Sequence, residues 1–359
     1  MTDYDIKVDR SMPRDAIAAA EASSKSLRRV FRDSLKIGDE RLLILGDYGI
    51  GRRTSAPALA YSYYLAAKDK GLDASIVMQK PRDRAQEISP EVLRSLRTLP
   101  KDSAIMQCVS NRLGTLNGLG KSFRKYCKAR GHRFTSASSL GNVRGKDFNT
   151  LVDAHNYSYK SMQKRQEKIK KKLDSADEVQ ITTPKGTDLL FSIKNSKAVY
   201  NHGIYSDRGA GGNLPAGEIY TPINRRSAYG KLVVDGSSRQ KDNTVLCKKP
   251  ITMYFNNGVV QKVSGGKEAA GLEQTYRWAE SRAKHPWGIR MAAELGIGLN
   301  TKSKVVGATI LDEKAHGTAH IATGSNYWFG GDIKAIIHLD QVFKDPEIRL
   351  DGRKLNIAR

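Results

Sequence analysis

Apolar and polar positions follow two different patterns along this chain, and the change of pattern divides it in two. Up to about residue 175, short apolar runs alternate with stretches in which apolar residues have helical spacing. The pattern predicts strands over 41–47, 74–79, 103–110 and 132–138, and helices over 14–36, 55–71, 90–98, 120–131 and 151–173. Strands alternating with helices of about 12 residues imply a parallel sheet covered by helices. We therefore predict a Rossmann-like α/β domain over residues 1–175.

From residue 176 the pattern changes to paired apolar runs separated by tight turns. Hairpins are predicted over 178–193, 250–263 and 347–357, and the second contains an Asn-Gly turn signal. A helix is expected over 267–285. We predict a second domain over 176–359, α+β and mainly antiparallel, which binds metal for the reasons that follow.

Two predicted strands of this second domain place polar groups on one face. His338 and Asp340 lie two residues apart on a strand predicted over 334–343, so their side chains share a face. The strand over 291–300 carries Glu294 on a face otherwise occupied mainly by glycines, where a bulky group could approach the backbone.

Two loops could complete a metal site on these strands. A Gly- and Pro-rich segment over 211–223 delivers Glu218. The glycines at 317, 324, 330 and 331 allow a loop to bring His320 and Tyr327 back over the His338 face. Imidazole and carboxylate groups are ligands of divalent cations. A single His-x-Asp pair is more often a hydrogen-bonded core feature, but the added carboxylates and the loop histidine favour a metal site.

Other features of the sequence limit the choice of function. The segment 46–54 lies between a strand and a helix, but two arginines stand where a phosphate-binding loop needs Lys and Ser or Thr. The three scattered cysteines, without a CxxC pair, indicate reduced thiols in a cytoplasmic protein. The polar segment 1–10 indicates no signal peptide, and no apolar run is long enough to span a membrane.

The net charge of +24 is the most unusual global property. It predicts attraction to polyanions such as nucleic acid or anionic lipid. Because no nucleic-acid-binding motif accompanies the charge, a polyanion-binding protein with a degenerate metal site is an alternative and not the main prediction.

The ordered segments 186–193, 213–221, 312–327 and 338–340, with the strand that carries Glu294, resemble the aminopeptidase T family of metallo-aminopeptidases. The resemblance implies a homodimer and two divalent ions, Zn²⁺, Co²⁺ or Mn²⁺, in the C-terminal domain. The ligands it implies are Glu218, Glu294, His320, Tyr327, His338 and Asp340. Two such ions can activate a water molecule while polarising a carbonyl group, and Tyr327 could donate to the developing oxyanion.

One position departs from the peptidase pattern. Family peptidases usually have a glutamate directly before the first ligand, and here that residue is Gly217. The sub-branch with a Gly-Glu pair resembles the 2,5-dihydroxypyridine dioxygenases, which use a single iron on the same scaffold. Counting ligands, we predict a metallo-aminopeptidase-like hydrolase acting on peptides or small amides. The alternative is an Fe(II) ring-cleaving dioxygenase.

Overall fold

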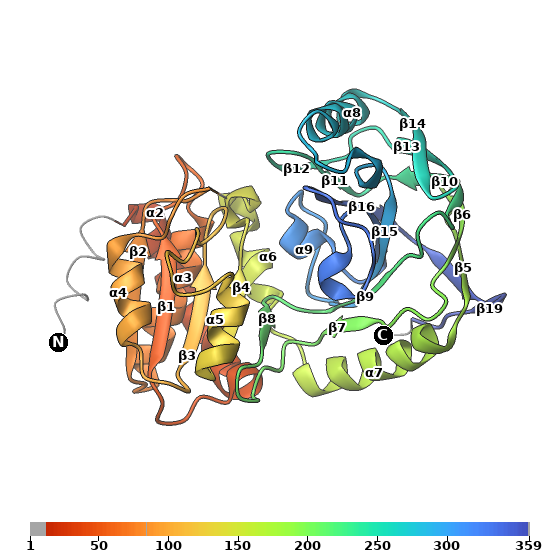
Figure 1. Ribbon diagram of the computed structural model, residues 1–359. Helices are drawn as coiled ribbons and strands as arrows, with labels where there is room; N and C mark the ends of the chain where they lie inside the picture. Colours follow the sequence, from red (N-terminus) through yellow and green to blue (C-terminus); the bar gives the residue numbers. More distant parts are fainter. Residues whose placement is uncertain (1–11, 84, 358–359) are drawn as a thin grey trace. The chain divides into compact units, whose positions relative to one another are not determined.

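The computed structural model describes residues 12–83 and 85–357 (Figure 1). The segment 1–10, on which the expectation of no signal peptide rests, lies outside the described residues. Contacts divide the chain into two units: the described residues up to Lys160 with Gly203–Ala216, and Ser161–His202 with the residues from Gly217 onwards. The predicted fold class is confirmed, because the first unit contains a parallel α/β sheet and the second contains antiparallel sheets.

The first unit is built on one five-stranded parallel sheet in the order β2-β1-β3-β4-β8. Its strands are β1 (Leu42–Asp47), β2 (Ala74–Gln79), β3 (Ala104–Cys108), β4 (Arg133–Ala137) and β8 (Gly211–Asn213). Its helical elements are α2 (Arg14–Val30), η1 (Phe31–Leu35), α3 (Ser55–Asp69), α4 (Pro90–Thr98), α5 (Phe123–Arg130), η2 (Leu140–Asn142), η3 (Gly145–Asp147) and α6 (Phe148–Asp153). Every residue of β1 and β3 is buried, which explains their continuous apolar runs.

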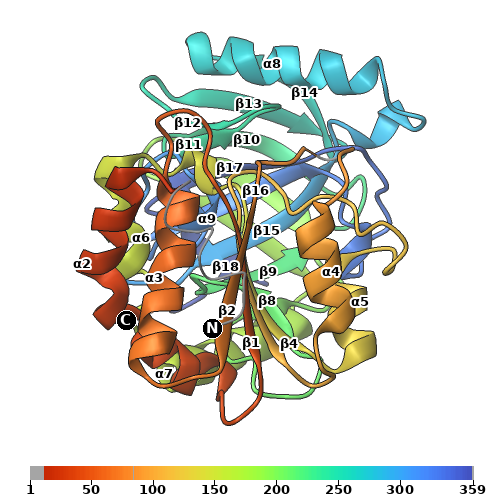
Figure 2. The same cartoon turned by 90° about the vertical axis from the view of Figure 1, so that its left-hand side faces the viewer.

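Helices cover both faces of this sheet. Figure 2 shows the sheet edge-on, with α2 and α3 on one side and α4 and α5 on the other. Leu96 of α4 and Phe134 of β4 belong to one buried apolar cluster. The helix ends follow their sequence signals: Ser89 accepts a hydrogen bond from the Val92 N–H at the start of α4, and Gly131 ends α5 with φ 75°.

The second unit contains two seven-stranded sheets. Its helical elements are α7 (Tyr159–Ser175), which begins at the boundary between the units, α8 (Lys267–Glu280), η4 (Pro286–Gly288), α9 (Thr309–Asp312) and η5 (Tyr327–Phe329). One sheet has the order β14-β13-β10-β6-β5-β18-β19. Its strands are β5 (Glu178–Thr182), β6 (Asp188–Ser192), β10 (Tyr229–Val234), β13 (Ile251–Asn256), β14 (Val259–Ser264), β18 (Glu347–Leu350) and β19 (Arg353–Lys354). Helix α8 lies beside β13 and β14 (Figure 1).

The other sheet carries the candidate site and has the order β12-β11-β17-β16-β15-β9-β7. Its strands are β7 (Val199–Asn201), β9 (Glu218–Pro222), β11 (Ser237–Arg239), β12 (Thr244–Leu246), β15 (Ala292–Gly298), β16 (Thr318–Gly324) and β17 (His338–Lys344). The central strands β15 and β16 are buried along their whole length. They pair antiparallel with each other and with β9 and β17.

Three predictions of element bounds need correction. The helix expected over 151–173 is two helices, α6 and α7, separated around Asn156 and Ser158, whose side chains compete with helical backbone bonds. The strand expected over 334–343 starts only at His338. The expected boundary at 175 also differs from the observed division, because β8 returns to pair with β4 while most of α7 belongs to the second unit.

Candidate metal centre

One face of three neighbouring strands carries the candidate ligands. Glu294 of β15 and Asp340 of β17 both lie opposite Ala322 of β16, so both carboxylates flank one methyl group. His320 precedes Ala322 by two residues, and His338 precedes Asp340 by two, so both imidazoles share this face. The predicted common face of His338 and Asp340 is therefore confirmed.

Gly296 makes room for one of the imidazoles. A Cβ atom at Gly296 would lie 2.0 Å from Cε1 and 2.1 Å from Nε2 of His320. Any side chain at this position would therefore displace the ring. The bare face predicted for the strand over 291–300 is confirmed, and the group that uses it is His320.

Four side chains meet on this face. Nε2 of His320 lies 3.1 Å from Oε1 of Glu294. Nε2 of His338 lies 3.1 Å from Oδ1 of Asp340 and 3.4 Å from Oε2 of Glu294. Single donor atoms of Glu294, His320 and Asp340 all lie within 4.8 Å of one another. We call Glu294, His320, His338 and Asp340 the four-residue cluster.

The orientation of the imidazoles suits a metal ion. Nδ1 of His338 lies 2.8 Å from the carbonyl oxygen of Ser325, which can only accept, so Nδ1 donates its proton there. In the neutral ring this leaves the lone pair of Nε2 facing the carboxylates. Nδ1 of His320 is buried and has no hydrogen-bond partner among the described residues, while its Nε2 faces Glu294. Two imidazoles with carboxylates form the donor set of non-haem Fe(II) sites, so the residues fit one divalent cation.

The carboxylates control the protonation of the two histidines. Burial alone would lower the pKa of both, but hydrogen bonds and charge from Glu294 and Asp340 raise it, to about 9 for His320 and about 10 for His338. Burial opposes ionisation of Asp340 as well, yet the adjacent His338 holds the pKa of Asp340 well below its usual range. The site therefore attracts positive charge strongly, and a cation would replace protons on the imidazoles.

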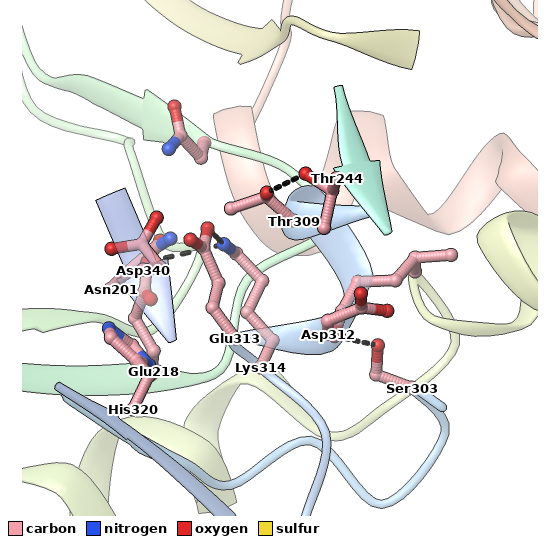
Figure 3. Close-up of polar contacts among 12 residues, drawn as sticks. Asn201, Glu218, Thr244, Ser303, Thr309, Asp312, Glu313, Lys314, His320 and Asp340 are labelled. Carbon is pink, nitrogen blue, oxygen red and sulfur yellow. Dashed lines mark hydrogen bonds and ion pairs between the residues drawn. The ribbon is translucent and has the colours of Figure 1, made fainter. Parts of the chain in front are cut away.

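Glu218 lies beside the cluster but has its own counter-ion. Its Oε1 is 3.2 Å from Nζ of Lys314, and the same ammonium group contacts Glu313 (Figure 3). The Lys314 side chain is fully buried. Burial disfavours its charged form, but the two carboxylates outweigh this and raise the pKa of Lys314, while burial and Glu218 raise the pKa of Glu313 to about 8. An internal ammonium group thus neutralises Glu218.

The structure does not place Tyr327 in the cluster. Tyr327 lies on η5 and is 58% exposed as a residue, with Nζ of Lys334 4.2 Å from the ring centroid. Among the described residues, the Tyr327 hydroxyl has no polar contact with the four-residue cluster. Its roles as ligand and oxyanion donor stay predictions that this geometry does not support.

Sequence reasoning missed two features of the site. It singled out neither Glu313 nor Lys314, because the adjacent charged residues Asp312, Glu313 and Lys314 give no local signal of a buried ion pair. It also overlooked Trp328 and Phe329, whose rings lie 4.8 and 6.2 Å from the imidazole of His338. Neither aromatic residue follows a periodic pattern that would have drawn attention to it.

A family model described as 2,5-dihydroxypyridine 5,6-dioxygenase, NicX, matches residues 152–357, more than half of the chain. The chain belongs to this dioxygenase family. The 2,5-dihydroxypyridine 5,6-dioxygenase of Pseudomonas putida KT2440 is 25% identical over 193 residues, which are 52% of this chain and 54% of the relative. The match thus spans about half the length of that relative.

Two solved structures share the fold of this NicX-family chain. The 2,5-dihydroxypyridine dioxygenase of P. putida KT2440 has a TM-score of 0.68 at 18% identity, covering 95% of this chain and 96% of that one. AmpT from Thermus thermophilus has a TM-score of 0.62 at 14% identity, covering 94% and 99%. At these identities the likeness concerns the fold alone.

The prediction of an aminopeptidase-like hydrolase, and of a protease in general, is wrong, because the family match is to dioxygenases. The structure gives a physical reason at Gly217. Its φ is +121°, and a Cβ atom there would lie 2.7 Å from Cβ of Asn300, so the glutamate of the peptidases does not fit. Glu218, counted as a ligand, is instead paired with Lys314.

Proposed function

We propose that this protein is a mononuclear non-haem Fe(II) dioxygenase that opens the ring of a dihydroxylated aromatic compound, with dihydroxypyridines as the first class to test. The observation that carries the proposal is the four-residue cluster, which contains the metal-ligand group found among the described residues, in a chain of the NicX family. The two imidazoles and two carboxylates of the cluster suffice for one cation. The neighbouring carboxylate of Glu218 is neutralised by Lys314, and no second group of metal-binding side chains is found in residues 12–83 and 85–357.

The residues of the cluster would divide the work of holding the ion. Glu294 and Asp340 would balance its charge, and the imidazoles of His320 and His338 would supply neutral nitrogen ligands. The Ser325 carbonyl would keep the His338 ring oriented. Deep burial of His320, with 1% of its side chain exposed, would restrict water to the open side of the ion.

Bound Fe(II) with open positions would supply the reactivity toward O₂ that organic rings lack by themselves. The overall reaction balances without a further reductant. One carbon–carbon bond of the ring breaks, and both atoms of O₂ enter the ring-opened product. One O₂ is therefore consumed for each ring.

The test is reconstitution without oxygen, with Fe²⁺ or with Zn²⁺ as a redox-inert cation. On addition of air and 2,5-dihydroxypyridine, the Fe²⁺ form should consume O₂ in equal amount to the ring lost, and the Zn²⁺ form should consume none. Asp340→Ala serves as the control for adventitious iron. An Fe²⁺-loaded protein that consumes neither O₂ nor any dihydroxylated ring would refute the proposal.

Several expectations about partners stay predictions. Neither the homodimer nor attraction to polyanions through the +24 charge is tested by the contacts of a single chain. A cytoplasmic location is likewise a prediction. Within the described residues, no helix is both long and apolar enough to cross a membrane.

A further inference from the structure

The four-residue cluster opens on one side. The exposed fraction of the side chain is 1% for His320, 7% for Glu294 and 9% for Asp340, but 20% for His338. A molecule that reaches a cation in the cluster therefore passes His338. Side chains beside the His338 imidazole will contact the molecule as it approaches the cation.

Two aromatic side chains stand at this opening. The Trp328 ring lies 4.8 Å from the His338 ring, at 67° between the planes, and Phe329 lies 5.2 Å from Trp328. Phe329 is half-buried against Tyr220, at 5.2 Å, whereas Trp328 is 61% exposed. Phe329 therefore supports the indole of Trp328, which presents apolar surface to solvent beside the polar four-residue cluster.

The turn that carries these rings is anchored to the metal-site strands. The Asn326 side chain is buried, donates to the Ala293 carbonyl at 3.0 Å and accepts from the Ile333 N–H at 2.8 Å. Ala293 directly precedes Glu294. Ser325, from the same turn, accepts the Nδ1 proton of His338. One short segment thus orients a candidate ligand and holds the aromatic rings at a set distance from the cluster.

We propose that Trp328 is a substrate-binding residue whose indole packs against the planar ring of the substrate while the ring's oxygen atoms reach the cation. This role rests on the proposed dioxygenase function. It means that one side chain, Trp328, selects aromatic over aliphatic chelating molecules. Offset or edge-to-face packing of two aromatic rings contributes beyond the burial of their surface. Because the indole contributes both ring packing and buried apolar surface, its loss should weaken binding of the substrate ring about tenfold or more.

The first experiment makes Trp328 the only tryptophan. The chain has three, so the double variant Trp278→Phe, Trp287→Phe leaves Trp328 as the sole indole reporter. The protein is loaded with Zn²⁺, which prevents turnover, and titrated with 2,5-dihydroxypyridine and with acetohydroxamate, an aliphatic chelator. Saturable quenching by the ring, and its reversal by acetohydroxamate, are expected. Absence of saturable ring binding would overturn the proposal.

The second experiment separates stacking from damage to the metal site. In Zn²⁺-loaded protein, calorimetry should show about tenfold or greater weakening of ring binding in Trp328→Ala, less than about threefold in Trp328→Phe, and unchanged acetohydroxamate binding in both. The matched control is Trp278→Ala, because Trp278 lies on α8 against Lys241 and Arg282, at 5.0 and 5.5 Å. The Trp278→Ala variant should bind both the ring and acetohydroxamate as the parent protein does.

Three results would tell the proposals apart. If Trp328→Ala keeps its Zn²⁺ and binds the ring as the parent protein does, the role of Trp328 is refuted, even if the Fe²⁺ enzyme cleaves rings. Equal weakening of ring and acetohydroxamate would also refute stacking, because Trp328 would then act through His338. If ring binding depends on Trp328 but the Fe²⁺ form consumes no O₂, the binding role stands and the dioxygenase function fails.

Discussion

Two pairs of histidines in this chain, all with little or no exposed surface, have pKa values shifted in opposite directions. His132 and His155 of the first unit have no exposed surface, and burial lowers the pKa of each to about 4. His320 and His338 of the second unit have a pKa raised to about 9 and about 10, although burial opposes their charge too. The difference comes from Glu294 and Asp340, which face only the second pair.

His155 illustrates what a structural histidine does. Its Nδ1 donates to the Leu151 carbonyl at 2.7 Å, and its ring meets the Tyr63 ring edge-on at 5.9 Å. These contacts make His155 a packing group of the buried interior. Burial alone therefore produces a neutral packing group, whereas burial among carboxylates produces a site prepared for a cation.

Removal of one imidazole of the second pair should have the strongest effect on metal binding. His320→Ala should weaken metal binding by at least about 100-fold, since even partners that only orient a ligand contribute about 10- to 100-fold. His155→Ala should keep the metal content of the parent protein, because its ring contacts no carboxylate. Metal analysis after dialysis, with circular dichroism to verify folding, measures both. Normal metal content in a folded His320→Ala variant would disprove the assignment of the site.

The next prediction concerns the buried ammonium group of Lys314, which is paired with Glu218 and Glu313. Lys314→Met should lower the free energy of unfolding by about 3–5 kcal/mol, because it leaves Glu218 and Glu313 buried without their counter-ion. Denaturant unfolding measures the loss. The double variant Lys314→Met, Glu218→Gln should recover part of it, since one buried charge is then removed. A single variant as stable as the parent would show that the pair is not an internal counter-ion system.

A weaker effect is expected for the first pair, in the pH dependence of stability. A lowered pKa in the folded state means that the unfolded chain binds more protons between about pH 6.5 and pH 4, so His132 and His155 reduce stability as the pH falls through that window. His155→Phe should remove up to about 1.4 kcal/mol per pH unit of this dependence. Unfolding of variant and parent at pH 7, 6, 5 and 4.5 gives the two slopes. Parallel slopes would contradict the lowered pKa of His155.

Much of the fold and part of the site follow from local pattern. Alternation of apolar and polar residues was sufficient to assign the two kinds of sheet and to place His338 and Asp340 on one face. The glycines beside Glu294 predicted a bulky group close to the backbone, and His320 is that group. These inferences worked because the side-chain direction on a strand repeats every two residues and needs no knowledge of distant parts of the chain.

The chemistry depended on contacts between residues far apart in the sequence. From the order of the motifs we predicted that Glu218 is a metal ligand and that the protein is a two-metal hydrolase. In the folded chain, however, Nζ of Lys314 lies 3.2 Å from Oε1 of Glu218. The same holds for Trp328, which lies next to His338 because β16 and β17 pair around the turn between them. Local sequence is enough to identify side chains that can bind a cation. Which of their charges are already neutralised follows from the folded chain, because a charge is balanced by its neighbours in space and not by those in the sequence.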